Sequence, residues 1–199
     1  HFCSAERQFR FPLEYGSMRT PTSQWTVTGA GALILAADAP APYITRVTTG
    51  RIVDMGITDT SNMGAAMAGA ACDTLERHFE DTGRGVDYYD AVITGDLGIT
   101  GGDILRELMG MDGLSLDARH FDCGGIIYDA ESQGVCAGGS GCGCSASVLA
   151  GYVLDNLRSG VWKRVLFAAT GALMSPTTSQ QGESIPGICH AVSFEMERC

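Results

Sequence analysis

Positively charged residues are scarce in this sequence. Its 199 residues include 13 lysines and arginines against 23 aspartates and glutamates, which gives a formal net charge of -10 at pH 7. The basic residues are scattered, whereas proteins that bind a phosphate backbone usually concentrate them in a patch. The charge balance therefore argues against a nucleic acid as partner.

Long apolar runs are also missing. Residues 30–37 and 165–174 are apolar, but neither run approaches the roughly 18 to 20 residues that a membrane-spanning helix needs. The first residues lack the basic and apolar regions of a signal peptide. We expect a soluble, intracellular protein that is still able to lie against a membrane protein.

The eight cysteines follow neither a disulfide nor a zinc spacing. They are irregularly spaced, and none forms a Cys-x-x-Cys pair. We expect reduced thiols, no obligatory disulfide, no metal and no cofactor. A zinc site assembled from distant cysteines stays the minor alternative, with the ligands Cys136, Cys142 and Cys144 plus Cys123 or Cys189.

Enough apolar residues are present for a sizeable core. With 45% hydrophobic residues, the chain is typical of one globular domain or of half of a larger one. It does not begin with Met, and we expect it to be a fragment of a longer protein.

Strand and helix patterns alternate along the chain. Periodicity and breaker residues predict strands at 25–35 and 43–48 as a hairpin-like pair, then a helix at 62–82, a strand at 89–94, a helix at 103–109, a helix ending at 158, and strands at 163–170 and 187–195. Such alternation predicts an α/β fold around a largely buried sheet.

A glycine-rich loop, residues 138–145, leads directly into an apolar helical pattern. Its glycines permit close approach of the main chain, and the helix start presents N–H groups to an anion. No Gly-Lys-Ser/Thr follows, and the glycine spacing differs from the dinucleotide fingerprint. The loop therefore predicts a site for another kind of anion, a carboxylate or an oxyanion.

Ligands of such sheets bind where the loops gather beyond the strand ends. The loops that we expect to share one pocket are residues 95–98, 138–145, 170–176 and 180–186.

Individual residues of these loops leave alternatives open. Asp96 suits a helix cap, a ligand contact or a base, and His190 suits a core hydrogen bond as well as a functional one. Cys142 and Cys144 flank the helix start, where a thiol becomes reactive, but cysteines there are also common as small buried fillers. Near the amino end, Arg7 is suited to bidentate carboxylate recognition or to a solvated surface.

Several segments together resemble the stage V sporulation protein AD family. The matching segments are residues 5–16, 26–32, 54–56, 93–97, 122–124, 137–145, 169–173 and 184–190. The resemblance runs in the same order from end to end but covers only the carboxy-terminal portion of that family. It implies a thiolase-like, layered αβαβα fold, with residues 1–60 closing the first half and residues 61–199 forming most of the second.

The resemblance also implies a function and partners. The function is binding of dipicolinic acid (pyridine-2,6-dicarboxylate), alone or as its calcium chelate, and help in moving it into the developing spore. The implied partners are sporulation-specific membrane proteins of the same operon and the missing first half or a second copy. The expected location is peripheral, at the spore inner membrane. The expected ligand-binding residues are Arg7, Asp96, Gly139, Ser140, Gly141, Cys142, Ser145 and His190.

Departures from thiolase-like enzymes argue against catalysis. Where such enzymes carry a histidine this chain has Gly95 and Asp96, and where condensing enzymes carry an asparagine loop it has residues 139–141. We therefore expect no catalytic residues and binding without turnover. Acyl transfer and a purely structural scaffold of the membrane channel are the alternatives.

Overall fold

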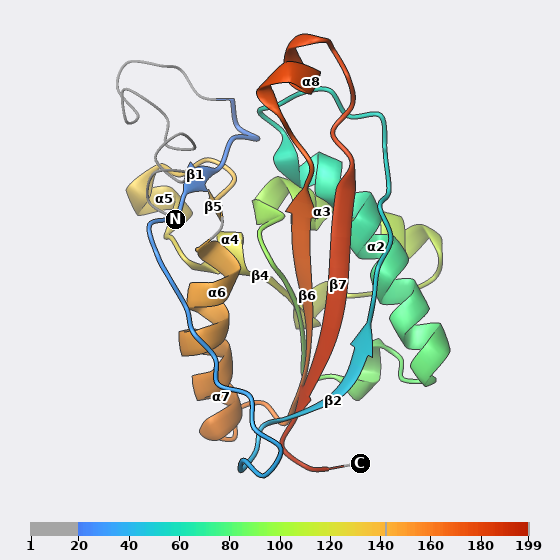
Figure 1. Ribbon diagram of the computed structural model, residues 1–199, viewed down its shortest axis with the longest axis vertical. Coiled ribbons are helices and arrows are strands. Elements are labelled where there is room, and N and C mark those ends of the chain that lie inside the picture. Colours follow the sequence, from blue (N-terminus) through green and yellow to red (C-terminus); the bar gives the residue numbers. More distant parts are fainter. Residues whose placement is uncertain (1–19, 142, 199) are drawn as a thin grey trace.

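The computed structural model describes residues 20–141 and 143–198 (Figure 1). Its strands are β1 (Trp25–Thr26), β2 (Tyr43–Thr48), β3 (Ala91–Thr94), β4 (His120–Asp122), β5 (Gly139–Ser140), β6 (Arg164–Ala172) and β7 (Gly187–Glu195). Its helices are α2 (Met63–Thr82), α3 (Gly98–Met111), α4 (Cys123–Ile126), α5 (Ala130–Gln133), α6 (Cys144–Val148), α7 (Leu154–Arg158) and α8 (Pro176–Gln180). A π-helical turn, Leu149–Val153, joins α6 to α7, and 3₁₀ turns cover Val86–Tyr88 and Asp117–Arg119.

A five-stranded mixed sheet is the centre of the molecule. Its order is β2-β7-β6-β3-β4, in which β3 runs parallel to β4 and β6, and β7 runs antiparallel to β6 and β2. The short strands β1 and β5 pair in parallel away from this sheet. The carboxyl ends of β3, β4 and β6 therefore open toward the same edge.

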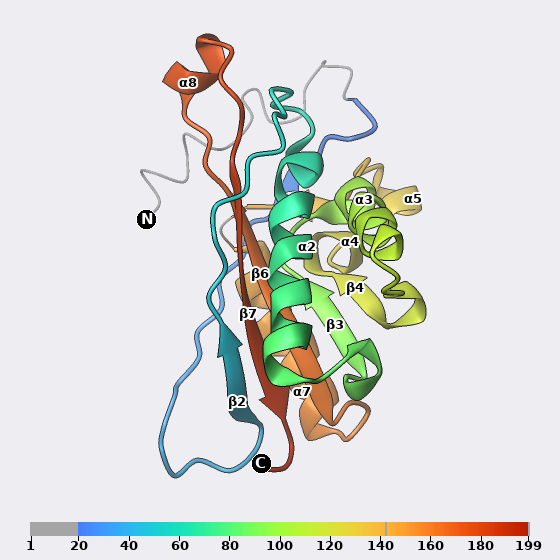
Figure 2. The same cartoon turned by 90° about the vertical axis from the view of Figure 1, so that its right-hand side faces the viewer.

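Helices cover both faces of the sheet. Helix α2 lies along β6 and β7 with α3 beside it, and α6 and α7 lie on the opposite face (Figures 1 and 2). Along β6, Leu166 joins the core under α2, whereas Val165 and Phe167 join the core under α6 and α7. This alternation follows from the two-residue period of a strand and confirms the predicted α/β layered class.

Helix α2 follows its sequence signals closely. The Asn62 side chain accepts a hydrogen bond from Ala65 N–H at 3.2 Å, and Gly83 ends the helix in the left-handed conformation at φ 65°. The predicted close packing of its small residues is also found, because a Cβ atom at Gly64 would lie 2.9 Å from Gly101 of α3. Two long helices can approach this closely only where both lack side chains.

The predicted hairpin between residues 25–35 and 43–48 is wrong. Strand β1 pairs with β5, and β2 pairs with β7. The reason lies in Gly29 and Gly31, where a Cβ atom would lie only 2.4 Å from Ser147 Oγ and 2.2 Å from the Ala146 carbonyl oxygen. The chain after β1 thus packs along α6 instead of folding back onto β2, as Figure 1 shows.

Other observed boundaries differ from the predicted ones by smaller amounts. Helix α3 begins at Gly98, earlier than the predicted 103, and it continues through Gly110 to Met111. Strand β4 was not predicted at all, because its three residues are too few for a periodic pattern. The last strand, β7, has the predicted bounds.

Candidate functional site

Asp96 lies in the turn that follows β3. Its Oδ2 atom accepts hydrogen bonds from Ser140 Oγ at 2.7 Å and from Gly141 N–H at 3.1 Å, and its Oδ1 accepts one from Thr170 Oγ1 at 3.1 Å. Thr170 Oγ1 in turn accepts from Asp96 N–H at 3.0 Å. The carboxylate thereby joins the ends of three strands, and the residue is only 9% exposed. We call Asp96, Ser140, Gly141 and Thr170 the Asp96 site.

The turn itself requires glycine at position 95. A Cβ atom there would lie 2.7 Å from Thr170 Oγ1, 2.9 Å from Thr170 N and 3.1 Å from Ser145 Oγ. Ser145, on the first turn of α6, thus borders the Asp96 site through Gly95. A side chain at this position would separate β3 from β6 where the site is formed.

Gln24 ties the two loops of the site together from a distant part of the chain. Its Nε2 donates to the Asp96 carbonyl oxygen at 2.9 Å and to the Gly139 carbonyl oxygen at 3.0 Å. The side chain is buried, so these bonds are shielded from competing water. Gly139 therefore contributes its backbone to the site.

The glycine-rich loop has the conformations for which glycine is needed. Gly138 and Gly141 have φ values of 102° and 110°, and a Cβ atom at Gly138 would lie 2.3 Å from the Gly124 carbonyl oxygen. The loop was predicted to hold an anion, and the carboxylate that its Ser140 and Gly141 donors face is that of Asp96.

The predicted site residues divide into three groups. The structure brings Asp96, Ser140 and Gly141 together directly, with Gly139 and Ser145 beside them. His190 is exposed on β7 and pairs with Ala169, the residue before Thr170. Arg7 and Cys142 lie outside the described residues.

His190 does not lie in the core. Its Nδ1 accepts a hydrogen bond from Gly50 N–H at 3.0 Å, and the residue is exposed. Of the four loops expected to share a pocket, the first three meet at Asp96. Residues 180–186 instead lie at the tip of the β6–β7 hairpin, where Ile185 N–H donates to the Ile57 carbonyl oxygen at 2.8 Å (Figure 1).

Cys144 is a buried filler and not a reactive thiol. Although it begins a helix, burial raises the pKa of its thiol to about 12, and the negative charges of Asp96 and Asp122 act in the same direction. Burial likewise raises the pKa of the neighbouring Cys123 thiol. Neither thiol is poised to become a thiolate at neutral pH.

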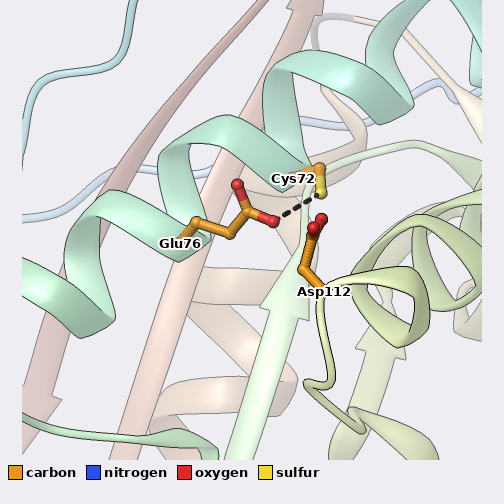
Figure 3. A group of neighbouring side chains, drawn as sticks. All are labelled: Cys72, Glu76 and Asp112. Atoms are coloured by element: carbon orange, nitrogen blue, oxygen red, sulfur yellow. Dashed lines mark hydrogen bonds between the residues drawn. The ribbon is translucent and has the colours of Figure 1, made fainter.

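One group of three potential metal ligands occurs within residues 20–141 and 143–198, and it lies apart from the cysteines considered above. The ligand atoms of Cys72, Glu76 and Asp112 lie within 4.8 Å of one another between α2 and the end of α3 (Figure 3). Cys72 Sγ donates to Glu76 Oε1 at 3.4 Å. Burial raises the pKa of Cys72 to about 12 and also raises the pKa of Glu76, assisted by the side-chain hydrogen bond between Glu76 and Asp112.

We therefore keep the prediction of no stoichiometric zinc in the full-length protein. Zinc binds deprotonated ligands, so it would have to displace the proton of the Cys72 thiol, whose pKa burial raises to about 12. Elemental analysis of protein purified without chelator should give well under one zinc per chain. One zinc per chain that is lost in Cys72→Ser and kept in Cys189→Ser, an equally buried thiol, would contradict this expectation.

Two buried histidines predict acid sensitivity. Burial lowers the pKa of His78 and of His120 from 6.5 to about 4, with the nearby cations Arg84 and Arg106 adding to the effect. Because the unfolded chain takes up these protons first, stability is complete above about pH 6.5 and falls as the pH drops toward 4. Each histidine contributes on the order of 1–3 kcal/mol to this loss.

Thermal unfolding of the full-length protein between pH 7 and 4.5 measures this effect. His78→Gln and His120→Gln should each make the melting temperature depend less steeply on pH. The exposed His190→Gln variant is the control and should leave the slope unchanged. An equal dependence of melting temperature on pH in all four proteins would show that His78 and His120 do not cause the loss of stability at low pH.

Comparison with known proteins supplies the family. A family model described as stage V sporulation protein AD (SpoVAD) matches residues 1–195. Stage V sporulation protein AD of Bacillus subtilis (strain 168) is 47% identical over 195 residues, which cover 98% of this chain. The chain belongs to the SpoVAD family.

The SpoVAD family name assigns the chain to sporulation, as the resemblance implied. The chain spans 57% of the length of the Bacillus subtilis relative, so a large part of that protein has no counterpart here. Among the helices of the described residues, none combines the length and apolar character needed to cross a membrane.

Proposed function

We propose that the SpoVAD protein to which this chain belongs binds dipicolinic acid at the Asp96 site and helps to move it into the developing spore. The observation that carries the proposal is the convergence of Ser140 Oγ, Gly141 N–H and Thr170 Oγ1 on one carboxylate at the carboxyl end of the sheet. These donors are engaged by Asp96 and hold its carboxylate in place, where its oxygens suit the calcium ion of a dipicolinate chelate. This location is also where ligands of open α/β sheets bind.

The charge of Asp96 favours the calcium chelate over the free dianion. A bare dicarboxylate next to Asp96 is repelled, and the net charge of -10 adds no attraction. Within the described residues, Asp96 Oδ1 accepts one hydrogen bond, from Thr170, whereas Oδ2 accepts two. The remaining lone pair of Oδ1 is available to a calcium ion, whose preferred ligands are oxygens.

Neighbouring residues extend the proposed site. Ser145 borders Gly95 and supplies a further donor to a second carboxylate. His190 pairs with Ala169, whose side chain lies on the opposite face of β6 from Thr170, so His190 stays in the proposed ligand set on the family resemblance alone. Arg7 and Cys142 stay in the proposed ligand set on the family resemblance alone.

We further propose that residues 1–60 close a first thiolase-like half of the full-length protein and that residues 61–199 form most of the second. After β1 the chain runs along α6 and α7 toward β2 (Figure 1). Ile34 is 96% exposed and Leu35 is 76% exposed, so an apolar, extended segment faces outward. It frames a cavity of about 600 Å³ with β2, which includes no residue of the Asp96 site. A sheet formed by the rest of the full-length protein, or a second copy, would cover such a segment.

The proposed membrane partners and location rest on the family resemblance, and no feature of the Asp96 site bears on them. We propose that the protein acts without catalysis and without nucleic acid, beside sporulation-specific membrane proteins of the same operon, at the spore inner membrane. The absence of a histidine base at position 96 supports binding over turnover.

Calorimetric titration of the full-length protein tests the proposal. We expect saturable binding of dipicolinate with calcium, and loss of at least about tenfold in affinity for Asp96→Asn. Asp90→Asn is the matched control, because Asp90 Oδ2 also holds backbone N–H groups, those of Lys163 and Arg164, but before β3 begins. Benzene-1,3-dicarboxylate keeps the two carboxylates without the chelating ring nitrogen and should bind more weakly.

The outcomes separate the candidate functions. Absence of heat with dipicolinate, with or without calcium, would contradict binding and leave the scaffold role. Thiol release from acyl-coenzyme A would support acyl transfer instead.

A further inference from the structure

Asp122, at the end of β4, is a buried carboxylate with four donors. Its Oδ1 accepts from Gly98 N–H at 2.8 Å and Gly125 N–H at 3.1 Å, and its Oδ2 accepts from Leu97 N–H at 2.9 Å and Thr94 Oγ1 at 2.6 Å. The residue is 7% exposed. Leu97 and Gly98 directly follow Asp96, so Asp122 fixes the backbone of the turn that carries the Asp96 carboxylate.

The hydroxyl of Thr94 connects Asp122 to a histidine. Thr94 Oγ1 lies 3.0 Å from His120 Nε2 and 2.6 Å from Asp122 Oδ2, with the Phe121 carbonyl oxygen farther away at 3.4 Å. Burial raises the pKa of Asp122, whereas its four hydrogen-bond donors act in the opposite direction. As a carboxylate, Asp122 accepts only, so the hydroxyl proton of Thr94 points to it. The ring nitrogen Nε2 must then be the donor to Thr94.

The hydrogen bond at the other ring nitrogen of His120 requires the same direction of proton donation. His120 Nδ1 lies 3.1 Å from Arg106 NH1, and a guanidinium can only donate. Nδ1 is thus the acceptor and Nε2 carries the proton, in agreement with a neutral ring whose pKa burial lowers to about 4. With Asp122 ionised, every proton in the series has one position, and Arg106 reaches the surface beside Asp103.

We propose that Arg106, His120 and Thr94 form a directed hydrogen-bond chain that acts through Asp122 as a positioning device for the Asp96 carboxylate. The ligand part of this inference rests on the proposed function, whereas the geometric part concerns Asp96 alone. Thr94, His120 and Asp122 are positioning residues, because their hydrogen bonds run to the turn and not to the ligand. A charge at the surface end polarises the hydroxyl, strengthens its bond to Asp122 and keeps the turn in one conformation.

The same fold contains a matched control. Thr48 Oγ1, at the end of β2, lies 2.8 Å from Nδ1 of His78 on α2, and both residues are buried away from the Asp96 site. Burial lowers the pKa of His78 to about 4, as for His120. Thr48→Val therefore removes a comparable threonine–histidine bond without touching the turn at Asp96.

The test compares Thr94→Val, Thr94→Ser and Thr48→Val in the full-length protein. Thr94→Val should weaken the binding of calcium dipicolinate about tenfold, whereas Thr94→Ser keeps the hydroxyl and should stay within about twofold of wild type. Thr48→Val should lower stability to a similar extent but leave the affinity within about twofold.

A readout without ligand separates this inference from the proposed function. The amide resonance of Gly141, observed with ¹⁵N-glycine and carbonyl-¹³C-serine labels, reports its bond to Asp96 Oδ2. We expect the chemical shift of the Gly141 amide to change in Thr94→Val, and to change in the same direction in Arg106→Met. Arg106 is partly exposed, so we expect Arg106→Met to preserve the fold. The Gly141 resonance should stay in place in Thr48→Val, and the second Ser-Gly pair of the chain, Gly160, should not move in any variant.

If the wild-type protein does not bind dipicolinate, the proposed function is wrong. The Gly141 resonance alone then tests whether the hydrogen-bond chain positions the Asp96 carboxylate. A Gly141 resonance that moves no further in Thr94→Val and Arg106→Met than in Thr48→Val would overturn the inference.

Discussion

Replacing Gly141 with valine is expected to lower the affinity for dipicolinate on the order of 100-fold, while the circular dichroism spectrum stays that of the folded protein. Gly141 has a φ of 110°, which a β-branched residue does not adopt without strain. Its Cβ atom would lie 3.4 Å from Thr26 Cγ2, so the γ-carbons of valine have to displace β1 or the loop. Either movement draws Gly141 N–H away from Asp96.

Gly160→Val is the control for this experiment. Gly160 ends α7 with a φ of 79°, and a Cβ atom there would meet no atom within 4 Å. The two variants share the backbone strain, but only position 141 belongs to the Asp96 site. Unchanged affinity in Gly141→Val, or an equal loss in Gly160→Val, would remove the glycine-rich loop from the ligand site.

The sequence predicted the parts of the fold that local patterns encode. Helix α2 carries a capping residue, an apolar period and a terminating glycine, and strand β7 is a continuous β-favouring run. Residues 25–35 also favour a strand, but a strand needs a partner, and propensity does not say which one. In the described residues the chain after Thr26 packs on α6 instead, because Gly29 and Gly31 allow it to approach the helix.

The site was predictable where its residues stand at strand ends. Asp96 and Ser140 lie in loops that were expected to meet, and the structure joins them at 2.7 Å. Thr170 closes a predicted strand, so its position was visible although its role was not. The sequence did not predict which anion the loop binds. Its glycine-rich composition predicts an anion, but it does not indicate that the Asp96 carboxylate of the same chain is that anion.

Gln24 and Asp122 were missed for different reasons. Gln24 bonds to residues 72 and 115 positions away, and no local pattern reports such a distance. Asp122 did carry a signal, because aspartate is a preferred helix N-cap residue, and its side chain does accept from Gly125 N–H. Its further bonds to Leu97 and Gly98 depend on the parallel pairing of β3 with β4, which the sequence did not show.

The full-length protein is expected to catalyse no acyl transfer from acetyl- or acetoacetyl-coenzyme A. Such transfer needs a nucleophile, a positioned base and oxyanion donors that act together, and loss of the base alone costs about 10²- to 10⁴-fold in rate. Position 96 holds a carboxylate, which repels a developing oxyanion. The Ser140 hydroxyl and Gly141 N–H already donate to that carboxylate and are not free to stabilise an oxyanion.

The thiols of Cys144 and Cys189 offer no substitute nucleophile. Burial raises the pKa of Cys144 and of Cys189 to about 12, so both stay protonated at neutral pH. Release of free thiol from the two thioesters, followed beside a competent thiolase as positive control, measures the activity. Steady release above the uncatalysed rate that disappears in Asp96→Asn or His190→Gln and persists in Asp90→Asn would show that this chain carries catalytic chemistry. Release at the uncatalysed rate in all four proteins is the expected result, because the groups that would stabilise the transition state are engaged with one another.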